Sequence, residues 1–303
     1  YENNFCNPIL THRHLGFDYP IKYVGHADLI ETPAGEWFMT MLAVRPIEGF
    51  TTMGRETFLA KVTWENGWPV VNPAVGILTD TVEINLPEWK PEEDPDSYTS
   101  RTGGKTCVPG SNRTYDFTNM KELGDEFLML RNPKDDMYAI VEGEGLCLNF
   151  DTVTLKELES PSFVSIRQQH HKFTVTAEVS TKELTAGKLA GLVLLQSNEY
   201  HLKAEVSDGM ASVILCEANQ DVVLGSANVE GDKVTLKLYV NDLNAAVSVV
   251  EGDKETLLAE EIDVRKLSTE VAGGFVGCCI GMYAVAEKET DGAAVFTKLS
   301  YEA

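Results

Sequence analysis

The chain has 303 residues, with 25 basic against 47 acidic side chains and a formal net charge of −22. Nucleic acid and anionic membranes would repel such a polyanion, so we expect neither as a partner. Hydrophobic residues make up 43% of the chain, and no apolar run approaches the roughly 18 residues of a membrane span. The length and composition predict a globular protein of about two domains without a transmembrane helix.

The first region contains two hairpin patterns. Residues 26–31 and 36–43 flank a Thr-Pro-Ala-Gly turn, and residues 57–64 and 68–71 flank Glu-Asn-Gly. The Asn66-Gly67 pair supplies the positive φ angles that a tight hairpin turn requires. Two successive hairpins predict four antiparallel strands within residues 1–87.

Residues 88–116 differ in composition from the rest of the chain. Pro91, Pro95 and Pro109 stand among acidic residues, serines and glycines. Proline cannot donate to a strand ladder and ends helices, so this stretch is predicted to be a solvated linker.

Residues 117–303 carry the pattern of a single β domain. Phe173, Val175, Ala177 and Val179 alternate with polar residues, which is the period of a half-buried strand. Turn residues recur at roughly ten-residue spacing, as in a sandwich or jelly roll. The predicted strands are 173–180, 191–196, 201–206, 212–216, 222–227, 234–240, 245–250, 274–284 and 295–301. The predicted class is all-β.

The six cysteines show no C-x-x-C spacing, which gives a zinc or redox motif little support; they are Cys6, Cys107, Cys147, Cys216, Cys278 and Cys279. We expect mostly buried, unpaired thiols, because a chain of this length needs no disulfide staples. The adjacent pair at 278–279 would face opposite sides of a strand. Unpaired thiols and no visible leader after Tyr1 favour a reducing, cytoplasmic location.

Three groups of polar residues are candidates for a site. His26 and Asp28 open a strand on one face, although a polar pair there is more often structural. Arg55 follows a glycine turn; it could grip substrate hydroxyls or a carboxylate, or pair with Glu56 at the surface. The adjacent histidines 170–171 would face opposite ways, which favours a structural role.

No G-x-S-x-G, H-E-x-x-H or P-loop motif is present. The residues alone therefore predict a two-part all-β protein but do not indicate its function. Longer segments do resemble a known family. They are NPILTHR (7–13), GHADLIET (25–32), LAVRP (42–46), GRETF (54–58), WENGWPV (64–70), LMLRNP (128–133), RQQHH (167–171) and LSTEVAGGF (267–275). They resemble family 43 glycoside hydrolases of the β-xylosidase and α-L-arabinofuranosidase type, across nearly the whole chain.

The resemblance implies a fold and a reaction. Residues 1–87 would be the last blade of a five-bladed β-propeller, and residues 117–303 a concanavalin-A-like sandwich. The family inverts at the anomeric carbon, with an Asp base, a Glu acid and a second Asp that tunes the acid. All three precede the segment matching residues 7–13, so the resemblance implies no catalytic carboxylate in this chain.

What the resemblance carries over is a set of supporting residues. His26 matches an axial histidine beneath the pocket, which in some members holds water or a calcium ion. Arg55 matches an arginine that contacts the sugar. Phe275 falls where a sandwich loop places an aromatic ring at the pocket mouth; the alternative is a core residue of the last strands. No organic cofactor is implied.

The implied partners are xylo- or arabino-oligosaccharides and upstream propeller blades, in the same or a separate polypeptide. A single blade should expose apolar surface that a monomer rarely tolerates. The alternative is a non-catalytic carbohydrate-binding or assembly module. Xylose or arabinose specificity and homo-oligomerisation stay open.

Overall fold

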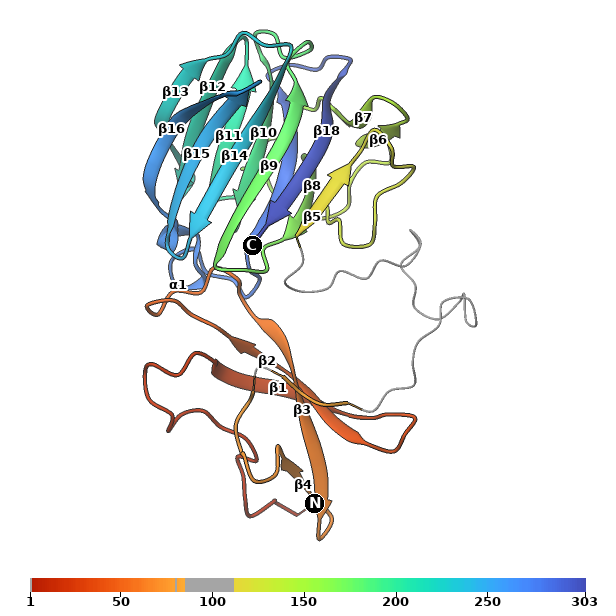
Figure 1. The fold of residues 1–303 in the computed structure, drawn as a ribbon, viewed down its shortest axis with the longest axis vertical. Coiled ribbons are helices and arrows are strands. Elements are labelled where there is room, and N and C mark those ends of the chain that lie inside the picture. Colours follow the sequence, from red (N-terminus) through yellow and green to blue (C-terminus); the bar gives the residue numbers. More distant parts are fainter. Residues whose placement is uncertain (1, 80, 85–111) are drawn as a thin grey trace.

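The computed structural model describes residues 2–79, 81–84 and 112–303 as two β bodies, drawn one above the other in Figure 1. The first is a four-stranded sheet, and the second packs a six-stranded against an eight-stranded sheet. In this part of the chain helix is confined to η1 (Val264–Leu267) and α1 (Thr269–Ala272), beside the junction. Among these residues no helix has the length and apolarity of a bilayer span. The all-β prediction is confirmed.

The first body confirms both predicted hairpins. Its strands pair antiparallel in chain order: β1 (Lys22–Glu31), β2 (Trp37–Val44), β3 (Glu56–Glu65) and β4 (Trp68–Val71). Asn66 and Gly67 have φ angles of 51° and 82°, as the tight turn between β3 and β4 requires. Propeller blades are four-stranded sheets of this kind, so the meander fits the expected blade.

The blade buries one small core and leaves other apolar side chains exposed. The buried cluster comprises Ile21, Met39, Met41, Ala43, Ala60, Val62, Val71 and Leu78. Strand β1 forms one edge of the sheet and is exposed along most of its length, including Leu29 and Ile30. Phe5, Phe17 and Tyr23 are exposed as well. Apolar surface around an open sheet edge is suited to being covered by another sheet.

The second body is the predicted sandwich. Its six-stranded sheet runs, in spatial order, β13 (Gln220–Asn228), β12 (Met210–Glu217), β11 (His201–Ser207), β10 (Lys188–Leu195), β17 (Cys279–Ala286) and β8 (Ser162–Arg167). Its eight-stranded sheet runs β16 (Lys254–Asp263), β15 (Asn244–Glu251), β14 (Lys233–Asn241), β9 (Lys172–Ser180), β18 (Ala293–Glu302), β7 (Gly145–Asn149) and β6 (Tyr138–Val141), with β5 (Arg113–Asp116) beside β18.

The apolar side chains of the period-two pattern fill the space between these two sheets. Phe173, Val175, Ala177 and Val179 on β9 are all buried in one cluster with apolar side chains of both sheets. Burial of large side chains at about 25 cal/mol per Å² is the main force that holds two such layers together. This core makes the sandwich the larger of the two bodies.

The boundary of the sandwich differs from the prediction. Residues 113–116 form β5, in which Tyr115 lies opposite Leu299 of β18 and packs against the core. Four residues of the predicted linker 88–116 therefore belong to the sheet, because a four-residue strand gives too short a pattern to recognise beside a proline-rich stretch. Of the rest of that linker, residues 88–111 lie outside the described residues.

Five further strands differ from the prediction: β6, β7, β8 and β16 were not predicted, and β17 begins later than expected. The strand predicted at 274–284 begins at Cys279, because Gly273 and Gly274 adopt positive φ angles in a turn after α1. Strand β16 was not predicted, since charged residues interrupt its alternation at the edge of the sheet.

The thiols follow the prediction in most respects. Cys6, Cys147, Cys216, Cys278 and Cys279 are unpaired, and all but Cys6 are wholly or partly buried. Cys278 is 1% exposed and its neighbour Cys279 is half-buried, which fits side chains on opposite faces. Cys107 lies outside the described residues.

Candidate functional site

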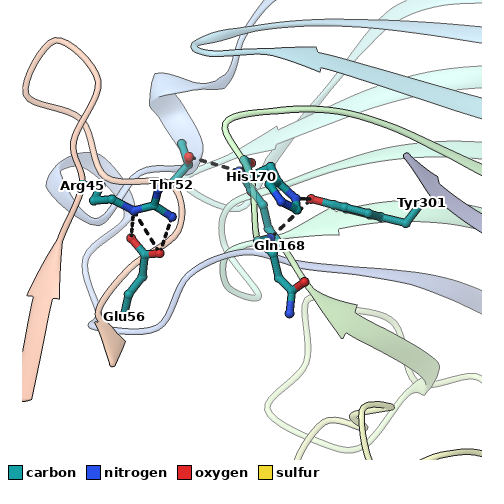
Figure 2. Close-up of polar contacts among 7 residues, drawn as sticks. Arg45, Thr52, Glu56, Gln168, His170 and Tyr301 are labelled. Atoms are coloured by element: carbon teal, nitrogen blue, oxygen red, sulfur yellow. Dashed lines mark hydrogen bonds and ion pairs between the residues drawn. The ribbon is translucent and has the colours of Figure 1, made fainter. Parts of the chain in front are cut away.

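The candidate site lies where the loop between β2 and β3 meets the sandwich. Arg45 and Glu56 stand at the two ends of this loop and form a bidentate ion pair (Figure 2). The guanidinium Nε lies 3.0 Å from Oε2, and Nη2 lies 2.6 Å from Oε1. Parallel N–H···O bonds fix direction as well as distance. The pair therefore sets the point at which Arg55, the last residue of the loop, enters the sheet.

Polar side chains of the sandwich hold the middle of the loop. Glu270 of α1 accepts from Thr51 twice: from the backbone N–H at 2.6 Å and from the hydroxyl at 2.8 Å. The buried amide of Gln168 donates to the Thr52 hydroxyl at 3.3 Å and to the His170 carbonyl at 3.0 Å (Figure 2). Because these bonds come from separate elements of the sandwich, the loop is fixed at several points.

Backbone meets backbone in the last part of the loop. The N–H of Arg55 donates to the carbonyl of Phe275 at 3.1 Å. A Cβ atom on Gly277 would lie 2.1 Å from the Met53 carbonyl oxygen, and one on Gly54 would lie 2.2 Å from the Gly277 nitrogen. Real Cβ contacts are never this short, so the two chains approach closely only because glycine stands at both positions.

We call the contact between the loop of residues 45–55 and the sandwich the seam. It brings together two of the predicted site residues, one from each body. The Arg55 guanidinium carbon lies 3.8 Å from the centroid of the Phe275 ring. A cation this close to a ring face is attracted by the ring's quadrupole, which is worth about 0.5–1 kcal/mol at an exposed site. Contact with the ring thus holds the arginine side chain against the sandwich.

The alternatives for these two residues are not what the structure shows. Phe275 is 64% exposed, so it is not a core residue of the last strands. Glu56 pairs with Arg45 and not with Arg55. Among the described residues, the structure gives the Arg55 guanidinium no hydrogen-bond acceptor. An exposed ring and a guanidinium with available donors are suited to a ligand that carries both apolar and hydroxyl or carboxylate groups.

His26 lies on β1, two strands from β3 but at the same level of the sheet as Thr57, since Gly25 pairs with Leu42 and Leu42 with Thr57. It lies in the exposed strand β1 with a φ of 52°, where the register with β2 shifts between Gly25 and Asp28. The bulge interrupts the alternation from which His26 and Asp28 were predicted to share a face. Of the described residues, the His, Cys, Asp and Glu side chains close enough together to hold an ion do not include His26.

The histidines after β8 have structural contacts. His170 Nδ1 lies 3.0 Å from the Tyr301 hydroxyl (Figure 2), and the Tyr301 ring stacks on Phe173. Burial lowers the pKa of both His170 and His171, so both rings are neutral near pH 7. The contacts of His170 fit the structural role predicted for it, and His171 is partly buried beside it.

Glu270 and Gln168 were not predicted as residues of the site. Glu270 lies 219 residues along the chain from Thr51, and Gln168 lies 116 from Thr52. No local spacing relates residues so far apart. Both residues do lie in segments that resemble the family, RQQHH and LSTEVAGGF, but the resemblance implied no role for them.

Comparison with known proteins gives this arrangement a class. Residues 114–302 match the family described as "Beta xylosidase C-terminal Concanavalin A-like domain", and residues 1–69 match "Glycosyl hydrolases family 43". A propeller blade joined to a concanavalin-A-like sandwich is thus an arrangement of glycoside hydrolases. The chain belongs to glycosyl hydrolase family 43.

Relatives from two bacteria support this assignment. A "Xylosidase/arabinosidase" of Butyrivibrio fibrisolvens is 36% identical over 292 residues, covering 94% of this chain and 53% of that protein. The "Non-reducing end alpha-L-arabinofuranosidase BoGH43B" of Bacteroides ovatus is 30% identical over 302 residues, covering 94% and 51%. The solved structure "Bacteroides ovatus Xyloglucan PUL GH43B" superposes with a TM-score of 0.85 at 26% identity, covering 100% of this chain and 58% of that one. The chain spans about half the length of the curated relatives that it matches.

Proposed function

We propose that this chain is the C-terminal portion of an inverting exo-glycosidase that acts on xylo- or arabino-oligosaccharides. The catalytic Asp base and Glu acid would lie on upstream blades, in a longer or a separate polypeptide. The names of the two bacterial relatives support the substrate class, and their greater length supports the upstream part.

The observation that carries the proposal is the contact between Arg55 and Phe275. The guanidinium would donate to hydroxyl groups of a terminal sugar, and the ring would cover an apolar face of that sugar and exclude water. An inverting pair stands roughly 6.5–9.5 Å apart to admit the attacking water. Fixed contacts on the sugar would keep its anomeric carbon between the two carboxylates.

The first body offers a surface on which the upstream blades would pack. Strand β1 offers an unpaired edge, and Leu29, Ile30 and Phe17 are exposed beside it. Closure of a propeller covers such edges. A calcium ion at His26 would be held through bound water, because Ca²⁺ takes oxygen ligands and not an imidazole nitrogen.

Two measurements on one sample test the proposal. Intact mass of every polypeptide in the denatured protein is expected to reveal an upstream polypeptide or a longer precursor. That sample is expected to hydrolyse aryl β-xylosides or aryl α-L-arabinofuranosides with inversion. A single 303-residue species that does not hydrolyse these substrates would contradict the proposed enzymatic activity. It would favour the alternative, a non-catalytic carbohydrate-binding or assembly module.

Replacing Phe275 by alanine tests the covering ring. In the active assembly we expect kcat/KM to fall about tenfold, because a ring contact of about 1–1.5 kcal/mol is lost. The matched control is Tyr239→Ala, which removes a half-exposed ring of β14 in the sandwich. Equal kcat/KM values for the two variants would show that the Phe275 ring does not contact the substrate.

A further inference from the structure

Three potential metal ligands line up across three neighbouring strands of the six-stranded sheet. His201 of β11 lies directly opposite Cys216 of β12, and Cys216 lies directly opposite Asp221 of β13. Residues directly opposite in antiparallel strands point to the same face. One ring nitrogen, the thiol sulfur and one carboxylate oxygen of the three all lie within 4.8 Å of one another.

The imidazole of His201 is oriented with one nitrogen available. Its Nδ1 lies 3.3 Å from the Ser197 carbonyl oxygen. A carbonyl can only accept, so Nδ1 carries the hydrogen and Nε2 keeps its lone pair. The side chain is 0% exposed, and Nε2 has no hydrogen-bond partner within the described part of the chain. An imidazole whose other nitrogen donates to a backbone carbonyl is the usual arrangement of a metal-binding histidine.

A pocket leads to two of these three groups. Its volume is about 390 Å³, and His201 and Asp221 line it together with Lys156, Lys203 and Tyr283. None of its lining residues takes part in the seam between the blade and the sandwich described above. The cluster is therefore a second feature of the sandwich, independent of the proposed glycosidase site.

The donor set selects the class of ligand. Nitrogen, thiolate sulfur and carboxylate oxygen are the ligands of zinc-type cations, whereas calcium and magnesium take oxygen alone. Three protein ligands leave a fourth tetrahedral position for water. The group does not resemble an activated nucleophile, because His201 donates to a backbone carbonyl and not to Asp221.

Two lysines lie near the cluster, and only one competes strongly for Asp221. Lys156 Nζ lies 2.9 Å from Asp221 Oδ1. Lys203 Nζ lies 3.9 Å from Oδ2 of Asp221 but 3.4 Å from the buried carboxylate of Glu205, which balances its charge. The Lys156 side chain is 30% exposed and can turn to solvent when another cation takes its place.

We propose that His201, Cys216 and Asp221 bind a zinc-type divalent cation, with Lys156 as an internal competitor for the carboxylate. On binding, the Cys216 S–H bond breaks, its proton passes to water, and the thiolate electron pair forms the metal–sulfur bond. The ammonium of Lys156 leaves Asp221. The cation then links β11, β12 and β13 at one edge of the sandwich.

Metal titration of the full 303-residue chain tests the site. Cys6→Ser and Cys107→Ser serve as the background, since Cys6 is an exposed thiol. Titration with Co²⁺ alone is expected to produce a thiolate-to-cobalt charge-transfer band and tetrahedral visible bands that saturate at one ion per chain. Zn²⁺ is expected to displace the Co²⁺ and remove these bands.

Substitutions then assign the ligands. Asp221→Asn is expected to weaken Co²⁺ binding at least tenfold, and Cys216→Ser to remove the charge-transfer band. Lys156→Met is expected to tighten binding several-fold, which a purely structural ion pair would not produce. The matched control is Asp232→Asn, because Asp232 is an exposed aspartate paired with Lys182.

Asp221 and Lys156 lie partly exposed at the pocket, so both variants should fold even where Cys216→Ser does not. The proposal is overturned if no band appears, if Asp221→Asn binds like Asp232→Asn, or if Lys156→Met leaves the affinity unchanged. Loss of hydrolytic activity plays no part in this test, so it is separate from the proposed function.

Discussion

Arg55→Ala is expected to lower kcat/KM about 100-fold in the active assembly that contains this chain, or about 2.7 kcal/mol of transition-state binding. The reason is the loss of charge-assisted donors that the Phe275 ring holds in place. Arg55→Lys is expected to recover only part of the loss, because an ammonium lacks the planar fork of the guanidinium. Steady-state kinetics on an aryl xyloside or arabinofuranoside measures both variants.

The control for this substitution is Arg131→Ala, which removes an arginine whose guanidinium donates to the Glu159 carbonyl within the sandwich. Its kcat/KM should equal that of the unsubstituted protein. If Arg55→Ala and Arg131→Ala behave alike, Arg55 does not contact the substrate.

The second large effect concerns the seam, where Gly277→Ala is expected to separate the blade from the sandwich. The new methyl carbon would lie 2.1 Å from the Met53 carbonyl oxygen and 2.2 Å from its carbon, and backbone atoms cannot turn away as a flexible side chain can. We expect a cost of about 3 kcal/mol or more, at the upper end of overpacking effects.

The distribution of tryptophan makes this prediction simple to measure. All four tryptophans precede residue 90, so tryptophan fluorescence reports on the N-terminal part, whereas far-UV circular dichroism reports mainly on the sandwich strands. In urea, Gly277→Ala should move the fluorescence midpoint to lower concentration and the dichroism midpoint much less.

Gly25→Ala is the matched control for Gly277→Ala. A Cβ atom on Gly25 meets nothing within 4 Å, and its φ angle is not positive. This variant should unfold like the unsubstituted chain by both probes. Coincident curves for Gly277→Ala and Gly25→Ala would show that the two bodies do not depend on the seam.

Local patterns were sufficient to predict most of the fold. Asn66-Gly67 determines a hairpin turn by itself, and the alternation from Phe173 to Val179 determines which face of β9 is buried. Both signals act over a few residues. β16 and the start of β17 were not predicted, because an edge strand accepts charged residues and the glycines at 273–274 continue an apolar pattern that is in fact a turn.

The candidate site could be predicted only in part. The resemblance pointed to Arg55 and Phe275, but no sequence pattern predicted that the guanidinium would lie over the ring. Their contact depends on the absence of side chains at Gly54 and Gly277, and on Glu270 reaching Thr51 from another body. Contacts of this kind join residues that are hundreds of positions apart, so they leave no periodic pattern in the sequence.

Contact between Arg55 and Phe275 also bears on any attempt to exchange the sandwich for that of a relative. A chimera would retain the arginine but inherit whatever residue the donor carries in place of Phe275. It would dock correctly only if the donor also has glycine where Gly277 stands. Deleting the sandwich would expose Arg55 and release the loop at Thr51 in a single step. Activity lost on truncation would therefore report on the contact between Arg55 and Phe275 as much as on a separate sugar-binding module.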